Sequence, residues 1–410
     1  MKASVVWRKT IVAIACAAVL MQLAVWPAAA APQISSFSLP GNQPLAVTAK
    51  LQAVGTPGLS QTVTLAIGLK LPDPGGLHAA VATTKNKRTA ALTPQQFLSA
   101  YAPSAGDYQS VVDWLKGQGF AVQTSPNRLL VLAAGTLGQA AAAFQVTLAD
   151  YNIDGRTCYA NTTAPQIPVA LSGIIQSVAG LDNIDYFQTF SHKAKAAVRP
   201  LTAGAPSHAS AVYQDVYGIT PLGIRTAYDV QPVIESGVNG AGQTIDVAIW
   251  NAIDPQDIAQ FDSSSGLPAT TADQVNQIVS QIGVGGTPGT DYSDSSSGSS
   301  EATLDVEMAH TMAPRANIDV YEGVDDDYST IEEIVNEAIV QHNSNVLSMG
   351  WGSPENSNDP AFGSLPTAFL ATFDAIFAQG AAEGMTILAA SGDSGKWSLN
   401  DLDSTNSTYS

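Results

Sequence analysis

Two acidic residues four positions apart offer the clearest acid–base chemistry in the chain. Glu301 and Asp305 stand at the start of a predicted helix, and this spacing puts both carboxylates on one helix face. Three apolar residues continue the same stripe: Met308, Ala309 and Met312. Two carboxylates held together in apolar surroundings do not both ionise easily, so one pKa rises and the pair can act as a general base in acid. The plain alternative is two acids that complement the helix dipole.

A second candidate is the sequence Ser391-Gly-Asp393-Ser-Gly395, which follows an apolar strand predicted at 385–390. Glycine on each side of Asp393-Ser394 permits a tight turn, and a protonated Asp393 at the end of the strand would donate to a developing oxyanion. The alternative is an ordinary Gly-Asp turn. Gly-Asp-Ser-Gly also surrounds the nucleophile of trypsin-like proteases. His310 and His342 lie in predicted helices, however, and fit neither that triad nor the subtilisin triad.

The third candidate is the run Ser348-Met-Gly350-Trp351-Gly352, which closes a strand predicted at 345–348. Small residues around one tryptophan would leave an extended edge that binds peptide main chain. A glycine turn with a packed tryptophan explains the same pattern. No His-Glu-x-x-His or comparable ligand spacing occurs, so the sequence predicts no metal-dependent peptidase site.

The second half of the chain contains the elements that must position these residues. Apolar runs predict four strands, and amphipathic runs between them predict three helices. The strands are expected at 244–250, 317–321, 345–348 and 385–390, and the helices at 301–314, 328–342 and 369–383. Continuously apolar strands separated by helices indicate a parallel sheet covered on both faces. The active site of such a sheet lies beyond the carboxyl ends of its strands.

The first half predicts a smaller α+β unit. Thr93 and Pro94 open a helix as cap and first residue. The remaining pattern alternates short strands with helices and closes with an apolar helix. We expect strands at 120–123, 129–132 and 146–148 and helices at 136–144 and 169–178.

Charge is divided unevenly between the two halves. Residues 211–410 contain 28 of the 35 acidic residues against Arg225, Arg315 and Lys396, a net charge of −25, whereas residues 1–210 have a net charge of +7. A domain this acidic repels nucleic acid and anionic membranes. Its self-repulsion is relieved when carboxylates are protonated, so the composition suits an acidic medium. The contrast also suggests that the basic half docks on the acidic half.

The chain of 410 residues is long enough for roughly two domains. A basic start, an apolar run and small residues predict a signal peptide at 1–31 and therefore secretion, with no membrane attachment after its removal. We expect an activation unit at 32–190, an exposed linker with the maturation cleavage at 191–212, and a catalytic unit at 213–410. Cys16 falls in the signal peptide, so Cys158 has no partner and no disulfide is predicted.

Taken in order, these motifs resemble the sedolisin (serine-carboxyl peptidase) family. Residues 40–185 are similar to its prokumamolisin-type activation domain, including Thr93-Pro-Gln-Gln-Phe and Ala179-Gly-Leu-Asp182. Pro221–Tyr228 resembles the start of the mature enzyme, Glu301-Ala-Thr-Leu-Asp305 its Glu–Asp pair, and Ser391–Gly395 its oxyanion motif. The resemblance implies a subtilisin-like α/β parallel-sheet catalytic domain, incomplete here, preceded by an α+β, ferredoxin-like activation propeptide.

The resemblance also implies residue roles. Glu301 would be the general base for a serine, Asp305 would hydrogen-bond and tune Glu301, and Asp393 would stabilise the oxyanion. Residues Ser348, Gly350, Trp351 and Gly352 would bind substrate, although we expect the family to favour Ser at position 350. Protein or peptide substrates and the chain's own propeptide would be the partners. Calcium is expected for full-length family members, at a site that this chain does not contain.

The family's nucleophile lies in a Gly-Thr-Ser motif after the oxyanion aspartate, and no such motif follows Asp393. We therefore expect a secreted, acid-acting endopeptidase zymogen that is inactive as this fragment, because a Glu–Asp pair without a serine has no acyl-enzyme route. The alternative is a non-catalytic pseudopeptidase or peptide-binding protein that retains the fold.

Overall fold

The computed structural model describes residues 35–44, 48–85, 90–153, 155–184, 187–189, 220–286, 298–352 and 366–392. The predicted signal peptide (1–31), the linker (191–212) and Asp393 lie outside these ranges. No helix within these ranges has the length and apolar character needed to cross a membrane.

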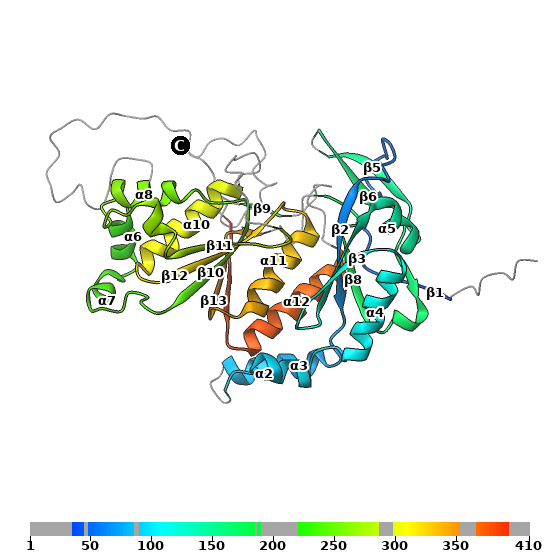
Figure 1. Ribbon diagram of the computed structural model, residues 1–410, viewed down its shortest axis with the longest axis horizontal. Coiled ribbons are helices and arrows are strands. Elements are labelled where there is room, and N and C mark those ends of the chain that lie inside the picture. The colour runs from blue at the N-terminus through cyan, green and yellow to red at the C-terminus, as the bar shows by residue number, and fades with distance from the viewer. Residues whose placement is uncertain are drawn as a thin grey trace, which may run out of the picture. The chain divides into compact units, whose positions relative to one another are not determined.

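A five-stranded sheet forms the centre of the second half of the chain (Figure 1). Its strand order is β11-β12-β10-β13-β15, and all neighbouring strands are parallel. The strands are β10 (Thr244–Trp250), β11 (Val279–Gly283), β12 (Asn317–Gly323), β13 (Val346–Met349) and β15 (Thr386–Ala389). The α/β class with a parallel sheet is therefore confirmed. The sequence analysis missed β11, a largely half-exposed edge strand without a continuous apolar run.

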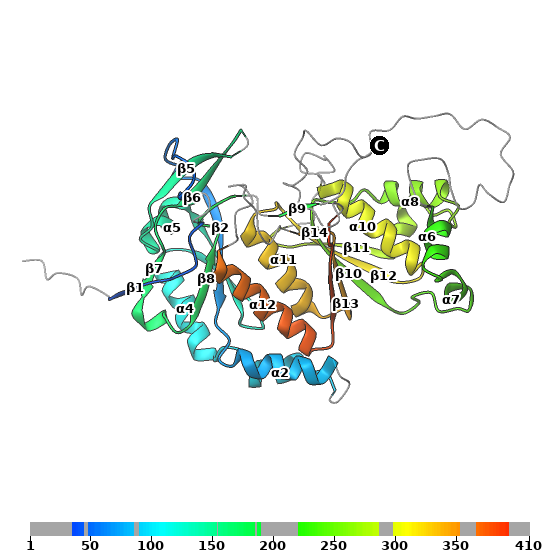
Figure 2. The ribbon, with the colours of Figure 1, turned by 180° about the vertical axis from the view of Figure 1, so that it is seen from behind.

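Helices cover both faces of this sheet. One layer consists of α11 (Tyr328–Gln341) and α12 (Thr367–Ala382), and the other includes α10 (Gly298–Met312) and α8 (Pro255–Ser264), as the two opposite views show (Figures 1 and 2). Shorter helices complete the second half: α6 (Pro221–Ala227), α7 (Gln231–Glu235) and α9 (Ala272–Val275). The three helices expected in this half are all present, with ends shifted by at most three residues.

An antiparallel sheet organises the first half of the chain. Its strand order is β3-β4-β2-β8. The strands are β2 (Thr62–Leu69), β3 (Ala121–Thr124), β4 (Leu130–Thr136) and β8 (Ile175–Ala179), and the helices on this part are α2 (Pro74–Lys85), α3 (Pro94–Ala100), α4 (Ala105–Gly117) and α5 (Leu137–Ala143). Thr93 and Gln96 form a reciprocal capping box before α3, which confirms the predicted helix start.

Both faces of this antiparallel sheet are buried. On β2, Leu65 and Ile67 belong to the core shared with α4 and α5, whereas Ala66 belongs to the core shared with α11 and α12. β4 alternates in the same way, with Val131 in the first core and Leu132 in the second. Alternate residues of a strand face opposite sides of a sheet, so the unbroken apolar run of β4 serves two cores. The front segment, as we call the described residues from 35 to 189, is thus packed onto the α11–α12 layer of the parallel sheet.

The helix predicted at 169–178 is wrong. Val169–Leu171 forms one 3-10 turn, and Ile175–Ala179 is strand β8, paired antiparallel with β2. An apolar run buried on both faces has no periodicity that separates strand from helix, and pairing with β2 decides in favour of the strand. The strand expected at 146–148 begins at Leu148 and forms a hairpin of β5 (Leu148–Ile153) with β6 (Arg156–Asn161). A further short pair joins β1 (Ser36–Ser38) to β7 (Gln166–Pro168).

The contact between the front segment and the α11–α12 layer contains a buried amide network. The Asn127 side-chain amide donates to Asn336 Oδ1 at 2.7 Å and to Gln379 Oε1 at 2.8 Å. Asn336 Nδ2 in turn donates to Ser125 Oγ at 2.9 Å. Among the described residues a single histidine–carboxylate contact crosses this interface, with His78 Nε2 at 3.0 Å from Asp374 Oδ2, and both side chains are exposed. The charge contrast suggested that the basic half docks on the acidic half. In the described residues this contact consists mainly of apolar packing and uncharged hydrogen bonds.

Candidate active site

Helix α10 carries Glu301 and Asp305 to the end of strand β13. Both side chains converge on Gly350, the residue that follows β13. A Cβ atom placed on Gly350 would lie 2.6 Å from both carboxylate oxygens of Asp305 and 2.6 Å from Glu301 Oε1. The structure therefore brings together the predicted acid pair and one of the predicted substrate-binding residues.

The surroundings of the pair favour a protonated carboxyl group. Glu301 is 6% exposed, and Oδ2 of Asp305 is shielded from solvent. Burial, followed by the neighbouring charge of Glu301, raises the pKa of Asp305 to about 7, although a hydrogen bond from the Gly350 backbone acts in the opposite direction. Below neutral pH, Asp305 can therefore keep a proton beside Glu301, which is the condition for the proton sharing that the spacing of four residues predicts.

The sequence of α10 explains the placement of the pair. Ala302 and Val306, one position after each acid, are fully buried in the core, which turns the adjacent stripe of Glu301 and Asp305 towards the sheet edge. Near the start of the helix, Ser299 Oγ donates to the carbonyl oxygen of Ala252 at 2.9 Å. Ala252 comes two residues after β10 ends, so the acids lie at the carboxyl edge of the parallel sheet, where sites in such sheets are found.

The predicted substrate-binding run occupies two environments. Ser348 lies inside the sheet, on β13, in register with Val247 on one side and Leu388 on the other. Trp351 and Gly352 form strand β14 and pair with a segment from the front half of the chain. The Trp351 indole N–H donates to the carbonyl oxygen of Ala248 at 2.7 Å, so this side chain is fixed in the core. The backbone of Trp351 remains available on the side of β14 that pairs with the front half, which we call the β14 edge.

Strand β14 is paired with the end of the front segment. Residues Gln188–Thr189 form β9, antiparallel to β14, with Thr189 opposite Trp351 and Gln188 opposite Gly352. Because the two strands are antiparallel, the chain direction of β9, from Gln188 to Thr189, points towards Gly350 and the carboxyl pair. An extended main chain lies along this edge and runs towards the pair, which is the arrangement expected of a strand-added peptide.

The predicted oxyanion residue, Asp393, lies outside the described residues. The two residues before it, Ser391 and Gly392, follow β15 at the same end of the sheet. The Ala390 N–H donates to the Met349 carbonyl oxygen at 2.9 Å, which brings the end of β15 beside the end of β13. Gly392 has a φ of +80°, which glycine adopts without steric cost.

A buried His–Asp pair escaped the sequence analysis. His310 Nε2 lies 3.3 Å from Asp262 Oδ1, and Thr270 Oγ1 donates to Asp262 Oδ2 at 2.6 Å. Burial lowers the pKa of His310, and the Asp262 carboxylate partly offsets that effect. The pair joins α8 to α10, so it stabilises the helix that carries the acids. A histidine and an aspartate 48 positions apart form no recognisable motif, so the sequence did not predict this pair.

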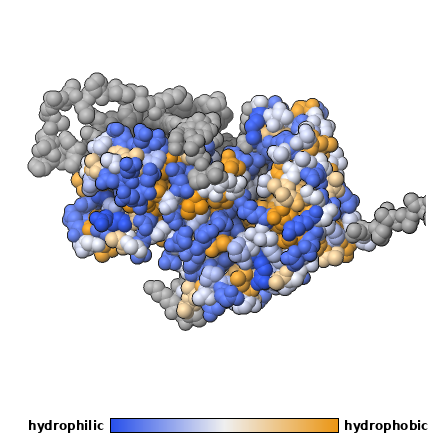
Figure 3. All heavy atoms as spheres, viewed as in Figure 1, coloured by the Kyte–Doolittle hydropathy of each residue, from blue (hydrophilic) through white to orange (hydrophobic). Residues whose placement is uncertain are grey.

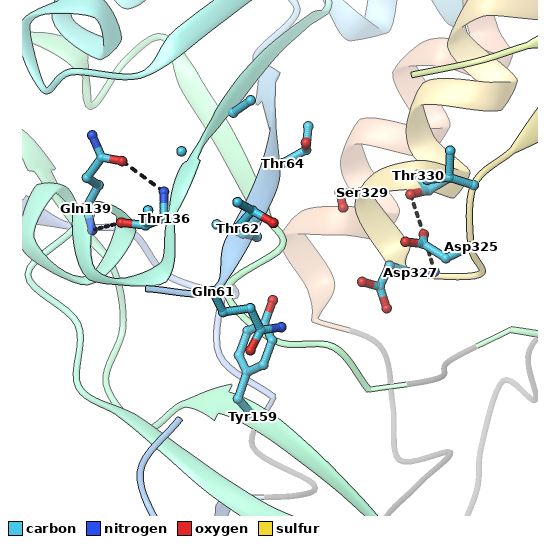
Figure 4. A pocket seen from close by; sticks show the side chains of 14 residues that line it. Gln61, Thr62, Thr64, Thr136, Gln139, Tyr159, Asp325, Asp327, Ser329 and Thr330 are labelled. Atoms are coloured by element: carbon cyan, nitrogen blue, oxygen red, sulfur yellow. Dashed lines mark hydrogen bonds between the residues drawn. The ribbon is translucent and has the colours of Figure 1, made fainter. Parts of the chain in front are cut away.

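A separate polar cavity of about 630 Å³ lies between the front segment and the loop after β12 (Figure 4). Thr62 and Thr136 line it from one side, and Asp325 and Thr330 from the other. None of the candidate site residues contributes to its lining. Within the described ranges, no group of three or more His, Cys, Asp or Glu residues is arranged to hold a metal ion.

The front segment matches a known family. Residues 49–184 match the family described as Pro-kumamolisin, activation domain. Sedolisin from Pseudomonas sp. (strain 101) is 29% identical over 359 residues, which cover 83% of this chain and 55% of sedolisin. Kumamolisin from Bacillus sp. (strain MN-32) is 26% identical over 320 residues, which cover 75% of this chain and 54% of kumamolisin. Xanthomonalisin from Xanthomonas sp. (strain T-22) is 25% identical, with 82% of this chain and 40% of xanthomonalisin covered.

The chain spans about half the length of the curated relatives it matches. Among solved structures, Pseudomonas sedolisin (serine-carboxyl proteinase), complexed with two molecules of pseudo-iodotyrostatin, aligns with a TM-score of 0.32 and 23% identity. That alignment covers 41% of this chain and 44% of the solved chain.

Proposed function

Because the chain is a sedolisin-family precursor with a pro-kumamolisin activation domain, we propose that it is the zymogen part of a secreted, acid-acting serine-carboxyl endopeptidase. The observation that carries the proposal is the convergence of Glu301 and Asp305 on Gly350, beside an edge that already holds an extended peptide. One carboxylate and one carboxylic acid at this place suit general base catalysis below neutral pH.

In the proposed mechanism Glu301 accepts the proton of a serine nucleophile, and Asp305 holds Glu301 in position through the shared proton. Asp393 then donates to the oxyanion. Peptide main chain binds along Trp351 and Gly352, and Gly350 leaves room for the acids.

The front segment acts as an intramolecular inhibitor in this proposal. Its last described strand, β9, lies on the edge that a substrate would use, and its sheet is packed on α11 and α12. Substrate reaches the edge only after β9 leaves, so separation of the front segment would precede peptide hydrolysis. Secretion is proposed from the basic and apolar start of the chain, at 1–31.

The test is hydrolysis of an unfolded protein substrate at pH 3 to 4 by the purified gene product, with mass determination of the protein and its fragments. We expect hydrolysis by a product that also contains the nucleophilic serine, and in that product Glu301→Gln and Asp305→Asn should each slow hydrolysis by about 100-fold or more, the range for loss of a general base. Glu235→Gln, on the exposed surface of α7, is the matched control and should retain the rate. Equal rates in all three variants would contradict the proposal. A protein that binds peptide at this edge without hydrolysing it would instead be a non-catalytic peptide-binding protein.

A further inference from the structure

Phe187 from the front segment is held in a cage of aromatic side chains from the second half of the chain. Its ring centroid lies 5.0 Å from that of Trp351, 5.5 Å from that of Tyr328 and 6.1 Å from that of Phe373. Phe187 meets Trp351 and Phe373 edge-to-face, at interplanar angles of 76° and 73°. Only 7% of Phe187 is exposed, so the cage encloses nearly the whole side chain.

The backbone of Phe187 leads directly into β9. The next two residues, Gln188 and Thr189, pair with Gly352 and Trp351. Trp351 therefore contributes twice, with its backbone at the edge and its indole in the cage. In a peptide paired with the same register, the residue opposite Gly350 comes three positions after the residue in the cage.

We propose that this cage, defined by Tyr328, Trp351 and Phe373, is a side-chain binding site for extended peptides, and that Phe187 occupies it as a built-in ligand. The site takes an aromatic residue three positions before the peptide residue that faces Gly350 and the acid pair. This inference rests on the proposed function in one respect: substrate is taken to use the β14 edge once β9 has left it.

The geometry favours an aromatic side chain over other residues. Edge-to-face contacts place the ring edge of one aromatic residue against the face of the next, and an aliphatic side chain has no corresponding attraction. A charged side chain would lose its hydration in a space lined by three aromatic rings. An alanine would leave most of the space unfilled and forfeit those contacts. The expected substrate class is therefore peptides with Phe, Tyr or Trp at this position.

The competing explanation is that Phe187 only completes a core and that the cage closes when Phe187 leaves it. The two explanations differ in what a chain without this side chain does. A binding site accepts an external aromatic residue, whereas a closed core accepts none.

The experiment uses the full chain with Phe187→Ala and a fluorescein-labelled peptide, Tyr-Phe-Gln-Thr-Phe, which repeats residues 186–190. Binding is followed by fluorescence anisotropy against a second peptide that has Ala in place of the first Phe. The Phe187→Ala chain should bind the Phe peptide at least about tenfold more tightly than it binds the Ala peptide, because burial of one large apolar side chain is worth at least this much. The Phe peptide should also bind the Phe187→Ala chain more tightly than it binds the wild-type chain, by a similar factor. Phe187→Leu, which fills part of the cage and is less disruptive, should bind the Phe peptide with intermediate affinity.

Phe144→Ala is the matched control, since Phe144 is also a fully buried aromatic residue but belongs to the core of the front segment. It should bind the Phe peptide no better than wild type does. Equal affinity for the two peptides, equal affinity of Phe187→Ala and wild type, or equal gains in Phe187→Ala and Phe144→Ala would overturn the proposal. Because binding is read without hydrolysis, a chain that fails as a peptidase can still pass this test, and a working peptidase can fail it.

Discussion

Gly350 and Asp305 face each other so closely that a Cβ atom on Gly350 would lie 2.6 Å from both carboxylate oxygens of Asp305. Contacts between a real Cβ and another heavy atom are longer than this, so the absence of a side chain at position 350 is a condition for the observed acid pair. The structure thus explains why this chain has Gly and not the expected Ser at position 350, because the acids occupy the space that a serine Cβ would need.

Gly350→Ala should displace the acid pair and destabilise the fold. The new methyl group would push the shielded carboxylates of Asp305 and Glu301 away from β13, and overpacking of this kind costs about 1–3 kcal/mol. Urea unfolding of the full chain measures the change in unfolding free energy. Gly173→Ala is the control, because a Cβ there meets nothing within 4 Å. Similar stability changes in the two variants would show that the space beside Gly350 does not constrain the pair.

The chain should be most stable in acid. Burial is the main cause that raises the pKa to about 7 for five carboxyl groups: Asp246, Asp305, Glu307, Glu333 and Glu383. These groups keep protons in the folded state between about pH 4 and pH 7, whereas the unfolded chain has released them. Since the folded state binds more protons in this window, its unfolding free energy falls as the pH rises.

Urea unfolding at pH 4, 5.5 and 7 checks this pH dependence. A fully shielded group would contribute about 1.4 kcal/mol for each unit of pKa change, and partial solvent access reduces the figure for the others. Asp305→Asn should flatten the curve, because the amide cannot ionise. An unfolding free energy that increases from pH 4 to pH 7 would be inconsistent with protonated carboxyl groups in the folded chain.

Asn127→Ala should weaken the contact between the front segment and the α11–α12 layer. The substitution removes the amide that donates to Asn336 and Gln379 and leaves two buried acceptors without that donor, at a cost of about 1–3 kcal/mol. The full chain should unfold at lower urea concentration by a corresponding amount. Asn152→Ala, near the end of β5 where the exposed side chain accepts from the Gly155 N–H, serves as the comparison and should change stability by less than about 0.5 kcal/mol. Equal effects would mean that the network contributes nothing to docking.

Four of the five strands of the parallel sheet were predictable because each contains a local run of apolar residues. Thr244–Trp250 is a strand over the whole predicted range, because its apolar run from Val247 to Trp250 is typical of a strand buried on both faces. Glu301 and Asp305 were predictable as a pair for a local reason, because residues four apart on a helix meet whatever the rest of the fold does. The carboxyl-edge location followed from the strand–helix alternation alone.

Features that depend on distant partners were not predictable. The pairing of β9 with β14 joins segments more than 160 residues apart, and two residues per strand leave no pattern in the sequence. The same holds for the cage around Phe187 and for the Asp262–His310 pair. The helix prediction for residues 169–178 was wrong for a related reason, because only the pairing with β2 shows that this apolar run contains a strand. The excess of acidic residues was visible in the composition, and Figure 3 shows hydrophilic residues over much of the displayed face, with hydrophobic ones among them.

Titration of Asp305 in the folded chain shows whether Glu301 and Asp305 form a proton-sharing pair. Carboxyl-selective ¹³C labelling, with Asp305→Asn to assign the resonance, would follow this group by NMR from pH 3 to pH 8. Asp305 should titrate near pH 7, and Glu301→Gln should lower this midpoint by removing the neighbouring charge. A midpoint near 4 in the folded wild-type chain, unchanged by Glu301→Gln, would contradict this expectation.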